Sequence, residues 1–350
     1  MFKKKGLLVL LAVLLMVSLV AGCGQKAQEP AKKNEPAASE PAKVENKDIT
    51  LIVPNSPGKG MDTYARMIVP YIEKHYPGAK ITVKNIVGAG GVVGTNQLWQ
   101  SKPDGLTIAF TSFPSILLAD LSGAEGVQFK ATELTYLGRA STEPRVFAVG
   151  GKSPFNKIED LAKAGRPIKF PSQGMDEDFF TAAVMAKSFG FELVQITGYE
   201  GNADTALAVI KGEGDGHITA LGDADPMIKA GDKKPLLMFA SERVKEYPDV
   251  PTALELTSGE NKEFMLVLTN MIEAHRTFFG PPNMDQKATE ELRTAISKAL
   301  SDPELIEKAK QANNPITAMD GAKLQEKVNE LAAGAEKIKP TLKEAVASIK

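Results

Sequence analysis

Glycine-rich loops that also contain serine, lysine and acidic residues carry most of the groups in this sequence that could bind a ligand. Residues 54–62 read Pro-Asn-Ser-Pro-Gly-Lys-Gly-Met-Asp, and residues 88–94 read Gly-Ala-Gly-Gly-Val-Val-Gly. Each segment follows an apolar run and precedes a stretch with helical spacing, so its backbone N–H groups lie at the positive end of a helix dipole. Loops of this kind favour anions.

The sequence offers little support for catalysis. It contains no Gly-x-Ser-x-Gly, His-Glu-x-x-His or Walker motif, and His75, His217 and His275 lie on separate predicted elements without metal-ligand spacing. The glycines of the 88–94 loop do not fit Gly-x-Gly-x-x-Gly, so a turn that packs a helix onto a strand is favoured over a dinucleotide site. We expect a binding protein with no metal and no cofactor, and an exported enzyme of unknown reaction remains an alternative.

The segments around these loops alternate between strand and helix. Apolar runs typical of strands lie at 49–53, 81–85, 106–110, 146–149, 168–170, 193–196, 216–219, 236–240 and 275–279. Helical spacing is found at 62–75, from 94 to about 100, and at 158–164, 178–189, 202–211, 285–300, 303–311 and 322–349. This order predicts an α/β protein with a parallel sheet, followed by a second α/β unit.

Loops that follow parallel strands gather at one edge of the sheet, where ligands dock. The sequence therefore predicts one site formed by residues 54–62, 87–94, 111–116, 171–177, 197–204 and 220–225.

The first 47 residues have a composition unlike the rest. Three lysines at 3–5 precede an apolar run that ends in Val-Ala-Gly-Cys at Cys23, which indicates a signal peptide over 1–22 and lipid attachment at Cys23. A membrane-spanning helix is the alternative, but about fifteen apolar residues fall short of the ~20 that a span needs. Residues 23–47 are rich in Ala, Pro, Glu and Lys and predict a disordered, lipid-anchored linker on the outer face of the cell membrane.

Composition excludes several classes of function. The chain has 350 residues, 43% of them hydrophobic, and its 42 basic and 43 acidic residues give a formal net charge of −1. The folded part has no block of basic residues, so we expect no nucleic-acid partner. A single cysteine excludes an internal disulfide and a cysteine zinc cluster.

Several motifs in order resemble one family. Ile-Thr-Leu-Ile-Val-Pro at 49–54 leads to Pro-Gly-Lys-Gly-Met-Asp at 57–62, and the 87–94 glycine loop and Pro-Asp-Gly at 103–105 follow. Later matches are Tyr199, Gly201 and Ala203 with Gly212 and Asp215, then Lys-Ala-Gly at 229–231 and Pro-Asp-Val-Pro-Thr at 248–252. Together they resemble the substrate-binding proteins of tripartite tricarboxylate transporters, the Bug-type or TctC-like family, over roughly residues 48–345.

The resemblance implies a bilobed periplasmic-binding-protein-like fold with two α/β domains joined by a hinge. One lobe would comprise 48–145 plus 265–350, and the other 146–264. Such proteins hold a small organic acid in the interlobe cleft and present it, as monomers, to the permease subunits of a membrane transporter. A lipoprotein that reports its ligand to a membrane sensor would share every one of these features.

The candidate ligand-binding residues combine the loops with the resemblance: Ser56, Gly58, Lys59, Gly60, Met61, Asp62, Gly88, Gly90, Thr111, Ser112, Ser172, Gly174, Met175, Asp176, Tyr199 and Asp223. Several of these have a structural alternative. Asp62 is equally suited to cap a helix, the hydroxyl residues to satisfy turns, Tyr199 to fill a strand end and Asp223 to cap a helix near Pro226.

The loops also depart from the family. Lys59 and Met61 replace a glycine and a threonine, and residues 172–178 read Ser-Gln-Gly-Met-Asp-Glu-Asp where the family commonly has Ser-Ala-Gly-Asn-Gly-Thr. Three acids near a carboxylate site would cost affinity unless they face solvent or meet a cation on the ligand. We therefore expect a monocarboxylate or an amino-bearing acid with apolar bulk in preference to citrate.

Overall fold

The computed structural model describes residues 46–348. The signal peptide predicted at 1–22, the lipid site at Cys23 and the linker up to residue 45 lie outside the described residues. The first strand, β1 (Lys47–Val53), begins two residues before the apolar run that predicts it. Its first residue is held in place because Lys47 donates its backbone N–H to the carbonyl of Gly78.

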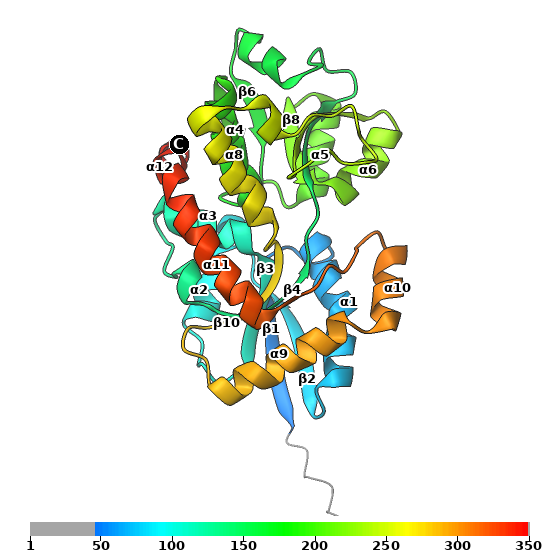
Figure 1. Ribbon diagram of the computed structural model, residues 1–350, viewed down its shortest axis with the longest axis vertical. Coiled ribbons are helices and arrows are strands. Elements are labelled where there is room, and N and C mark those ends of the chain that lie inside the picture. The colour runs from blue at the N-terminus through cyan, green and yellow to red at the C-terminus, as the bar shows by residue number, and fades with distance from the viewer. Residues whose placement is uncertain (1–45, 349–350) are drawn as a thin grey trace, which may run out of the picture. The chain divides into compact units, whose positions relative to one another are not determined.

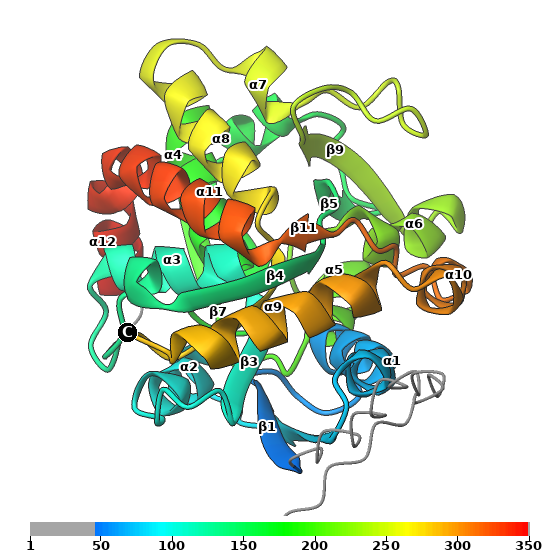
Figure 2. The same cartoon turned by 60° about the horizontal axis from the view of Figure 1, so that its bottom comes forward.

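Six strands form the sheet of the first lobe (Figures 1 and 2). Their order is β11-β4-β10-β3-β1-β2, with β2 (Ala79–Asn85), β3 (Thr107–Ser112), β4 (Thr135–Ser141), β10 (Arg276–Gly280) and β11 (Met319–Asp320). Strands β1, β2 and β3 run parallel, whereas β10 pairs antiparallel with both β3 and β4. The centre of this sheet therefore joins segments from both ends of the chain.

Helices cover both faces of this sheet because side chains alternate along each strand. In β1, Leu51 and Val53 pack with α1 (Gly60–His75), α9 (Gln286–Leu300) and α10 (Pro303–Gln311), whereas Ile52 faces the opposite side. On that side lie α2 (Val92–Trp99), α3 (Phe113–Ser122) and α11 (Gly321–Ala335). Short 3-10 turns, η1 (Ala89–Gly91) and η2 (Ala131–Glu133), precede α2 and β4.

The second lobe is built on two smaller sheets, one of three strands and one of two. Strand β5 (Arg145–Gly150) lies between β8 (Gly216–Ala220) and β9 (Lys233–Phe239) and is antiparallel to both, while β6 (Ile168–Pro171) and β7 (Leu193–Ile196) are parallel. The other elements here are η3 (Ile158–Lys163), α4 (Glu177–Phe189), α5 (Asn202–Lys211), α6 (Leu221–Lys229), α7 (Ala253–Leu256) and α8 (Gly259–Ile272).

Two chain segments connect the lobes, one after β4 and one after α8, and they are bonded to each other. Thr142 donates its hydroxyl to the carbonyl of Ile272 at 2.5 Å, and Arg276 pairs with Glu143 at 2.5 Å. At the C-terminus, η4 (Glu336–Ile338) leads to α12 (Lys339–Ala347), which packs against both α3 and α4 (Figure 1). Both lobes are thus tied at the connection and along one flank.

The three-stranded sheet of the second lobe differs from the parallel arrangement that alternating elements suggest. Every residue of β5 is buried, and after Arg145 its sequence is apolar up to Gly150, a pattern that fits a parallel or an antiparallel neighbour equally well. The sequence analysis also omitted β4, α3, α6 and α8. Within residues 46–348, no helix is both long enough and apolar enough to cross a bilayer. The lobe boundaries at 145/146 and 264/265 stay a prediction.

Candidate functional site

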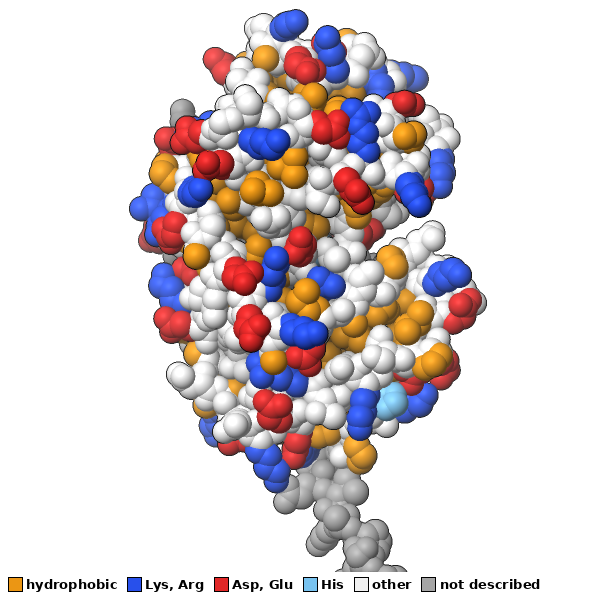
Figure 3. All heavy atoms as spheres, in the orientation of Figure 1, with side chains coloured by type: hydrophobic (Ala, Val, Ile, Leu, Met, Phe, Trp, Pro, Cys, Tyr) orange, Lys and Arg blue, Asp and Glu red, His pale blue; other side chains and the backbone are white. Residues whose placement is uncertain are grey.

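A cavity of about 840 Å³ lies between the two lobes and contains residues from all six predicted loops. The space-filling view shows the surface hollowed between the lobes (Figure 3). Twelve of the predicted site residues line this cavity: Ser56, Gly58, Lys59, Gly60, Met61, Gly88, Gly90, Thr111, Ser112, Asp176, Tyr199 and Asp223. The strand-loop-helix pattern in the sequence thus brings segments far apart in the chain to one place.

Asp62 lies just outside the lining and holds the first loop in shape. Its carboxylate accepts the backbone N–H of Gly58 at 2.7 Å, the side-chain amide of Asn85 at 2.9 Å and the guanidinium of Arg66. Burial would raise the pKa of Asp62, but these bonds outweigh burial and lower it. Of the two roles open to this residue in the sequence, the contacts favour the structural one.

Ser172, Gly174 and Met175 are the other predicted residues that do not line the cavity. Their loop instead touches the glycine loop of the first lobe, where a Cβ placed on Gly90 would lie 2.6 Å from the carbonyl carbon of Met175. Gly90 also has φ of +65°, a conformation that other residues rarely adopt. The segment 173–176 therefore closes one side of the cavity with its backbone.

Four helices begin at the cavity without a side-chain cap, namely α1, α2, α5 and α6. The first N–H groups of α2 and α6 find other acceptors, such as the carbonyls of Gly88 and Pro144. By contrast, the first two N–H groups of α1 and of α5, those of Gly60, Met61, Asn202 and Ala203, have no hydrogen-bond partner in the described part of the chain. Ser112 caps α3 and Asp176 caps α4. Free amides at a helix start bind carboxylates and other anions.

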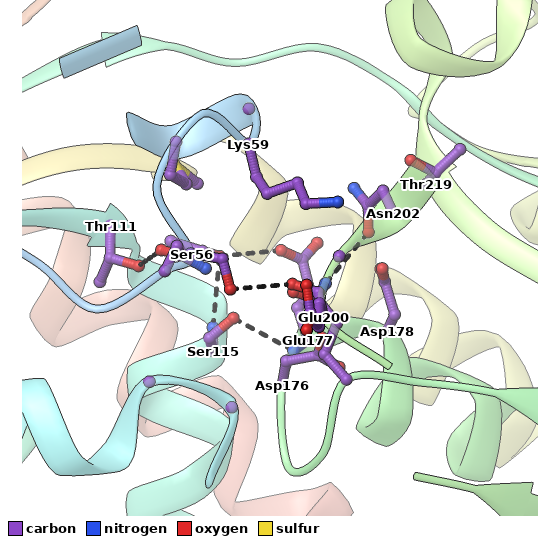
Figure 4. A pocket seen from close by; sticks show the side chains of 18 of the residues that line it. Ser56, Lys59, Thr111, Ser115, Asp176, Glu177, Asp178, Glu200, Asn202 and Thr219 are labelled. Atoms are coloured by element: carbon purple, nitrogen blue, oxygen red, sulfur yellow. Dashed lines mark hydrogen bonds between the residues drawn. The ribbon is translucent and has the colours of Figure 1, made fainter. Parts of the chain in front are cut away.

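A buried ion cluster forms another wall (Figure 4). The carboxylate of Glu177 accepts the hydroxyl of Ser112 at 2.8 Å and lies 3.1 Å from the Nε2 of His275 and 3.1 Å from the Nε of Arg145. Arg145 also pairs with Asp178. The cluster links strand β5, helix α4 and the second connection between the lobes.

Burial and charge act differently on the three neighbouring acids. Burial would raise the pKa of Glu177, but the charge of Arg145 and the hydrogen bonds from His275 and Ser112 bring it down to about 2. Burial raises the pKa of Asp176 to about 6 and also raises that of Asp178, because one guanidinium offsets only part of the charge of three carboxylates. Burial lowers the pKa of His275, so this imidazole is neutral near pH 7.

Contacts across the cleft join the lobes at its mouth. Lys59 of the first lobe pairs with Asp204 of α5 at 3.1 Å, and Ser56 donates its hydroxyl to the carbonyl of Glu200 at 3.2 Å. The side chains of Lys59 and Asp204 are 33% and 42% exposed, so water screens this pair. The structure is that of a closed cleft.

The sequence analysis missed the arginines and histidines of the site and one of its threonines. These residues all line the cavity: Arg145, Arg276, His217, His275 and Thr219. The sequence could have indicated some of these residues, because they are charged or polar side chains within or at the start of an otherwise apolar strand. Such a side chain needs a partner when it is buried. Within residues 46–348, no group of three or more His, Cys, Asp or Glu side chains is arranged to hold a metal ion.

Comparisons with known proteins identify the family to which this chain belongs. Residues 65–343 match the family described as "Tripartite tricarboxylate transporter family receptor". A UPF0065 protein from the tcbD-tcbE intergenic region of Pseudomonas sp. (strain P51) is 27% identical over 76% of this chain and 77% of its own length.

Two solved structures share the fold. The periplasmic binding protein BugD superposes with a TM-score of 0.69 at 21% identity, covering 84% of this chain and 97% of its own. MatC of Rhodopseudomonas palustris with bound malate gives 0.68 at 18% identity, covering 86% and 99%. With its two-lobed α/β fold, the chain belongs to the receptor family of tripartite tricarboxylate transporters.

Proposed function

We propose that this protein captures a small organic acid in its interlobe cavity and delivers it to the permease of a tripartite tricarboxylate-type transporter. The observation that carries the proposal is the pair of uncapped helix starts, α1 and α5, which face the cavity from opposite lobes with free N–H groups. A carboxylate between them would accept hydrogen bonds from both lobes and so stabilise the closed form. The proposed role is binding without catalysis.

The fold neighbours support a carboxylate ligand. MatC was solved with malate, and another R. palustris protein, Rpa4515, was solved with adipate at a TM-score of 0.67. Both ligands are small dicarboxylates, and both proteins share this fold at less than 20% identity. We carry over only the chemical class, because the loop residues of this chain depart from the family.

Export and anchoring are part of the proposal. The basic segment, the apolar run and Cys23 support secretion with lipid attachment, and residues 24–45 would then tether the receptor near its permease. The twelve lining residues named above are the proposed ligand contacts, within lobes 48–145 plus 265–350 and 146–264.

Calorimetry with a panel of small organic acids tests the binding step. We expect at least one acid to bind the purified protein at one site per chain, and its amide, which lacks the negative charge, to bind far more weakly. Acids that all fail to bind, or an acid and amide that bind equally, would contradict the proposal. Uptake of the bound acid by cells with and without the gene then tests delivery.

A further inference from the structure

We propose that Asp176 and Asp178 form a cation-binding pole in the cavity, so that the ligand carries a protonated amine as well as a carboxylate. This inference rests on the proposed function, since it describes the second end of a ligand whose carboxylate lies at the starts of α1 and α5. It makes the ligand an amino acid in the broad sense, in place of a di- or tricarboxylate.

The charges that line the cavity favour a ligand with a positive group. Five acids line it, namely Asp176, Glu177, Asp178, Glu200 and Asp223, against three permanently charged cations. Each of those cations already has an acidic partner: Lys59 pairs with Asp204, Arg145 with Glu177 and Asp178, and Arg276 with Glu143. The buried Lys233, outside the lining, offsets part of the charge of Asp178 and Asp223, and the remaining excess of acids opposes a second carboxylate and attracts an ammonium group.

The three neighbouring acids differ in how fully their oxygens are used. Glu177 is occupied by Ser112, His275 and Arg145. Asp176 accepts the N–H of Phe179 through Oδ1, and Asp178 meets Arg145 through Oδ1. Asp176 accepts a second backbone N–H, that of Asp178, whereas no hydrogen bond reaches Oδ2 of Asp178 from the residues that the structure describes. Asp178 therefore has an oxygen available to a ligand, and Asp176 lies beside it without an ion-pair partner.

A buried hydroxyl supplies independent evidence for a ligand group at this wall. Thr219 on β8 is fully buried, lines the cavity, and its Oγ1 has no hydrogen-bond partner among residues 46–348. Figure 4 shows Thr219 on the same side of the pocket as Asp178. A buried hydroxyl without a partner is costly, and an ammonium group, with three donors, can satisfy a hydroxyl and a carboxylate together.

A purely structural role for the acids fits the contacts less well. Glu177 provides the hydroxyl bond and the histidine bond that hold the connection between the lobes, and it shares the ion pair of Arg145 with Asp178. Asp176 forms no ion pair with any described basic residue, although it is buried and lies two positions from Asp178. An asparagine would cap α4 equally well. The charge of Asp176 is therefore surplus to the fold.

Matched ligands test the inference. The probes are ω-amino acids of increasing chain length up to ε-aminocaproate, together with leucine, and each is compared by calorimetry with the amine-free acid of the same length and with the corresponding diacid. We expect at least one amino-bearing acid to bind about tenfold or more tightly than its amine-free and diacid counterparts, as a charge-assisted hydrogen bond in a buried site requires.

Variants locate the effect. Asp178→Asn and Asp176→Asn should each remove most of the preference for the amine, because the amino-bearing acid loses affinity while the amine-free acid, relieved of a nearby negative charge, binds no more weakly. Asp225→Asn is the matched control, because Asp225 lies on α6 outside the lining and bonds to Lys229 and Tyr247. It removes one nearby negative charge and should leave the preference intact. Thermal melts check that each variant is folded, and either aspartate variant alone is sufficient.

The possible outcomes separate the inference from the proposed function. Amine-free acids or diacids that bind as tightly as their amino-bearing counterparts would overturn the inference and leave the proposed function standing. Failure of every acid, with or without an amine, would overturn the proposed function. If hexylamine binds as tightly as ε-aminocaproate, the result would support the cation-binding pole and contradict a contribution of the ligand's carboxylate to binding. A preference that survives in both aspartate variants would place the amine elsewhere.

Discussion

At the scale of single residues, Asp176 shows a conflict between stability and charge. Its carboxylate is buried at the start of α4, and the groups facing it are Arg145, Glu177, Asp178 and the backbone N–H of Phe179. Burial is the largest influence and raises its pKa to about 6. The ionised form that would hold an amine is thus the form that destabilises the fold, which is common at functional sites.

Asp176→Asn should therefore stabilise the protein at neutral pH. Because the folded pKa of about 6 exceeds the ordinary value of 3.8, the folded state binds more protons than the unfolded state between these values, and the stability of the native protein falls as pH rises through this window. The variant lacks this loss and should be more stable by about 3 kcal/mol above pH 7. Urea unfolding across this range measures it. A variant less stable than the native protein at about pH 8 would mean that the charge contributes to the fold.

Arg145→Gln tests how far the buried carboxylates depend on their cation, and how this dependence changes with pH. Without the guanidinium, Glu177 and Asp178 lose their shared cation in a buried place, which we expect to cost about 3–5 kcal/mol at neutral pH. The loss should shrink toward about pH 5, because the carboxylates can then take up protons. Denaturant unfolding at both pH values decides this. Adding Asp178→Asn to the variant should recover part of the stability, and an equal loss at both pH values would refute the charge argument.

At the scale of elements, the useful feature is where helices begin. Helices α1 and α5 start at the cavity without caps, whereas α9, α10 and α11 start away from it and are capped by aspartates. Position at the cavity does not by itself decide capping, since α3 and α4 also start there and are capped by Ser112 and Asp176, and α8 starts away from it without a side-chain cap. The free N–H groups are a feature of α1 and α5, and they are available to a ligand.

Gly60→Pro should remove one such donor without breaking the helix. Gly60 is the first residue of α1, where proline is well tolerated, and Lys59 before it has the extended conformation that a following proline requires. We expect affinity for the carboxylate ligand to fall by about tenfold or more, because a hydrogen bond to a charged group is lost. Gly60→Ala keeps the N–H and has open space for its Cβ, so it is the control. Equal affinities for the two variants would exclude this amide from binding.

At the scale of the whole molecule, the contacts between lobes determine closure. Gly90 of the first lobe meets the backbone of Met175 and Asp176 in the second, and a Cβ there would approach them to 2.6 and 2.7 Å. Lys59 and Asp204 join the lobes elsewhere at the cleft. The contact at Gly90 is between backbones, so no side chain there can move aside to make room for a larger residue.

Gly90→Ala should hold the cleft open. We expect a larger radius of gyration than that of the native protein at saturating ligand, and affinity reduced by about tenfold or more, since closure must displace a backbone. Gly126→Ala is the matched control, because Gly126 also has a left-handed φ, of +89°, but open space around it. Small-angle scattering and calorimetry measure both effects. Identical behaviour of the two variants would show that this contact does not limit closure.

The sequence predicted the loops of the site better than the charges within it. A strand, a glycine-rich turn and a helix are local patterns, so residues 54–62 and 88–94 were identified from short segments. Arg145 and His275 meet Glu177 only through long-range packing, and no local pattern links them. The antiparallel pairing of β5 was missed for the same reason, since a fully buried strand carries no record of its neighbours.

Strand β10 lies in the middle of the first sheet but comes late in the chain, and this order has a consequence for biosynthesis. Strand β4 has only β10 and β11 as neighbours, and both follow residue 275 in the chain. A nascent polypeptide that has passed residue 145 therefore cannot complete its first sheet, and it exposes the unpaired edges of β3 and β4 until the last quarter of the chain is made. Such distant pairing makes folding slow. Slow folding of this kind would keep the polypeptide competent for export across a membrane, and we expect the unpaired edges to need protection by chaperones against aggregation.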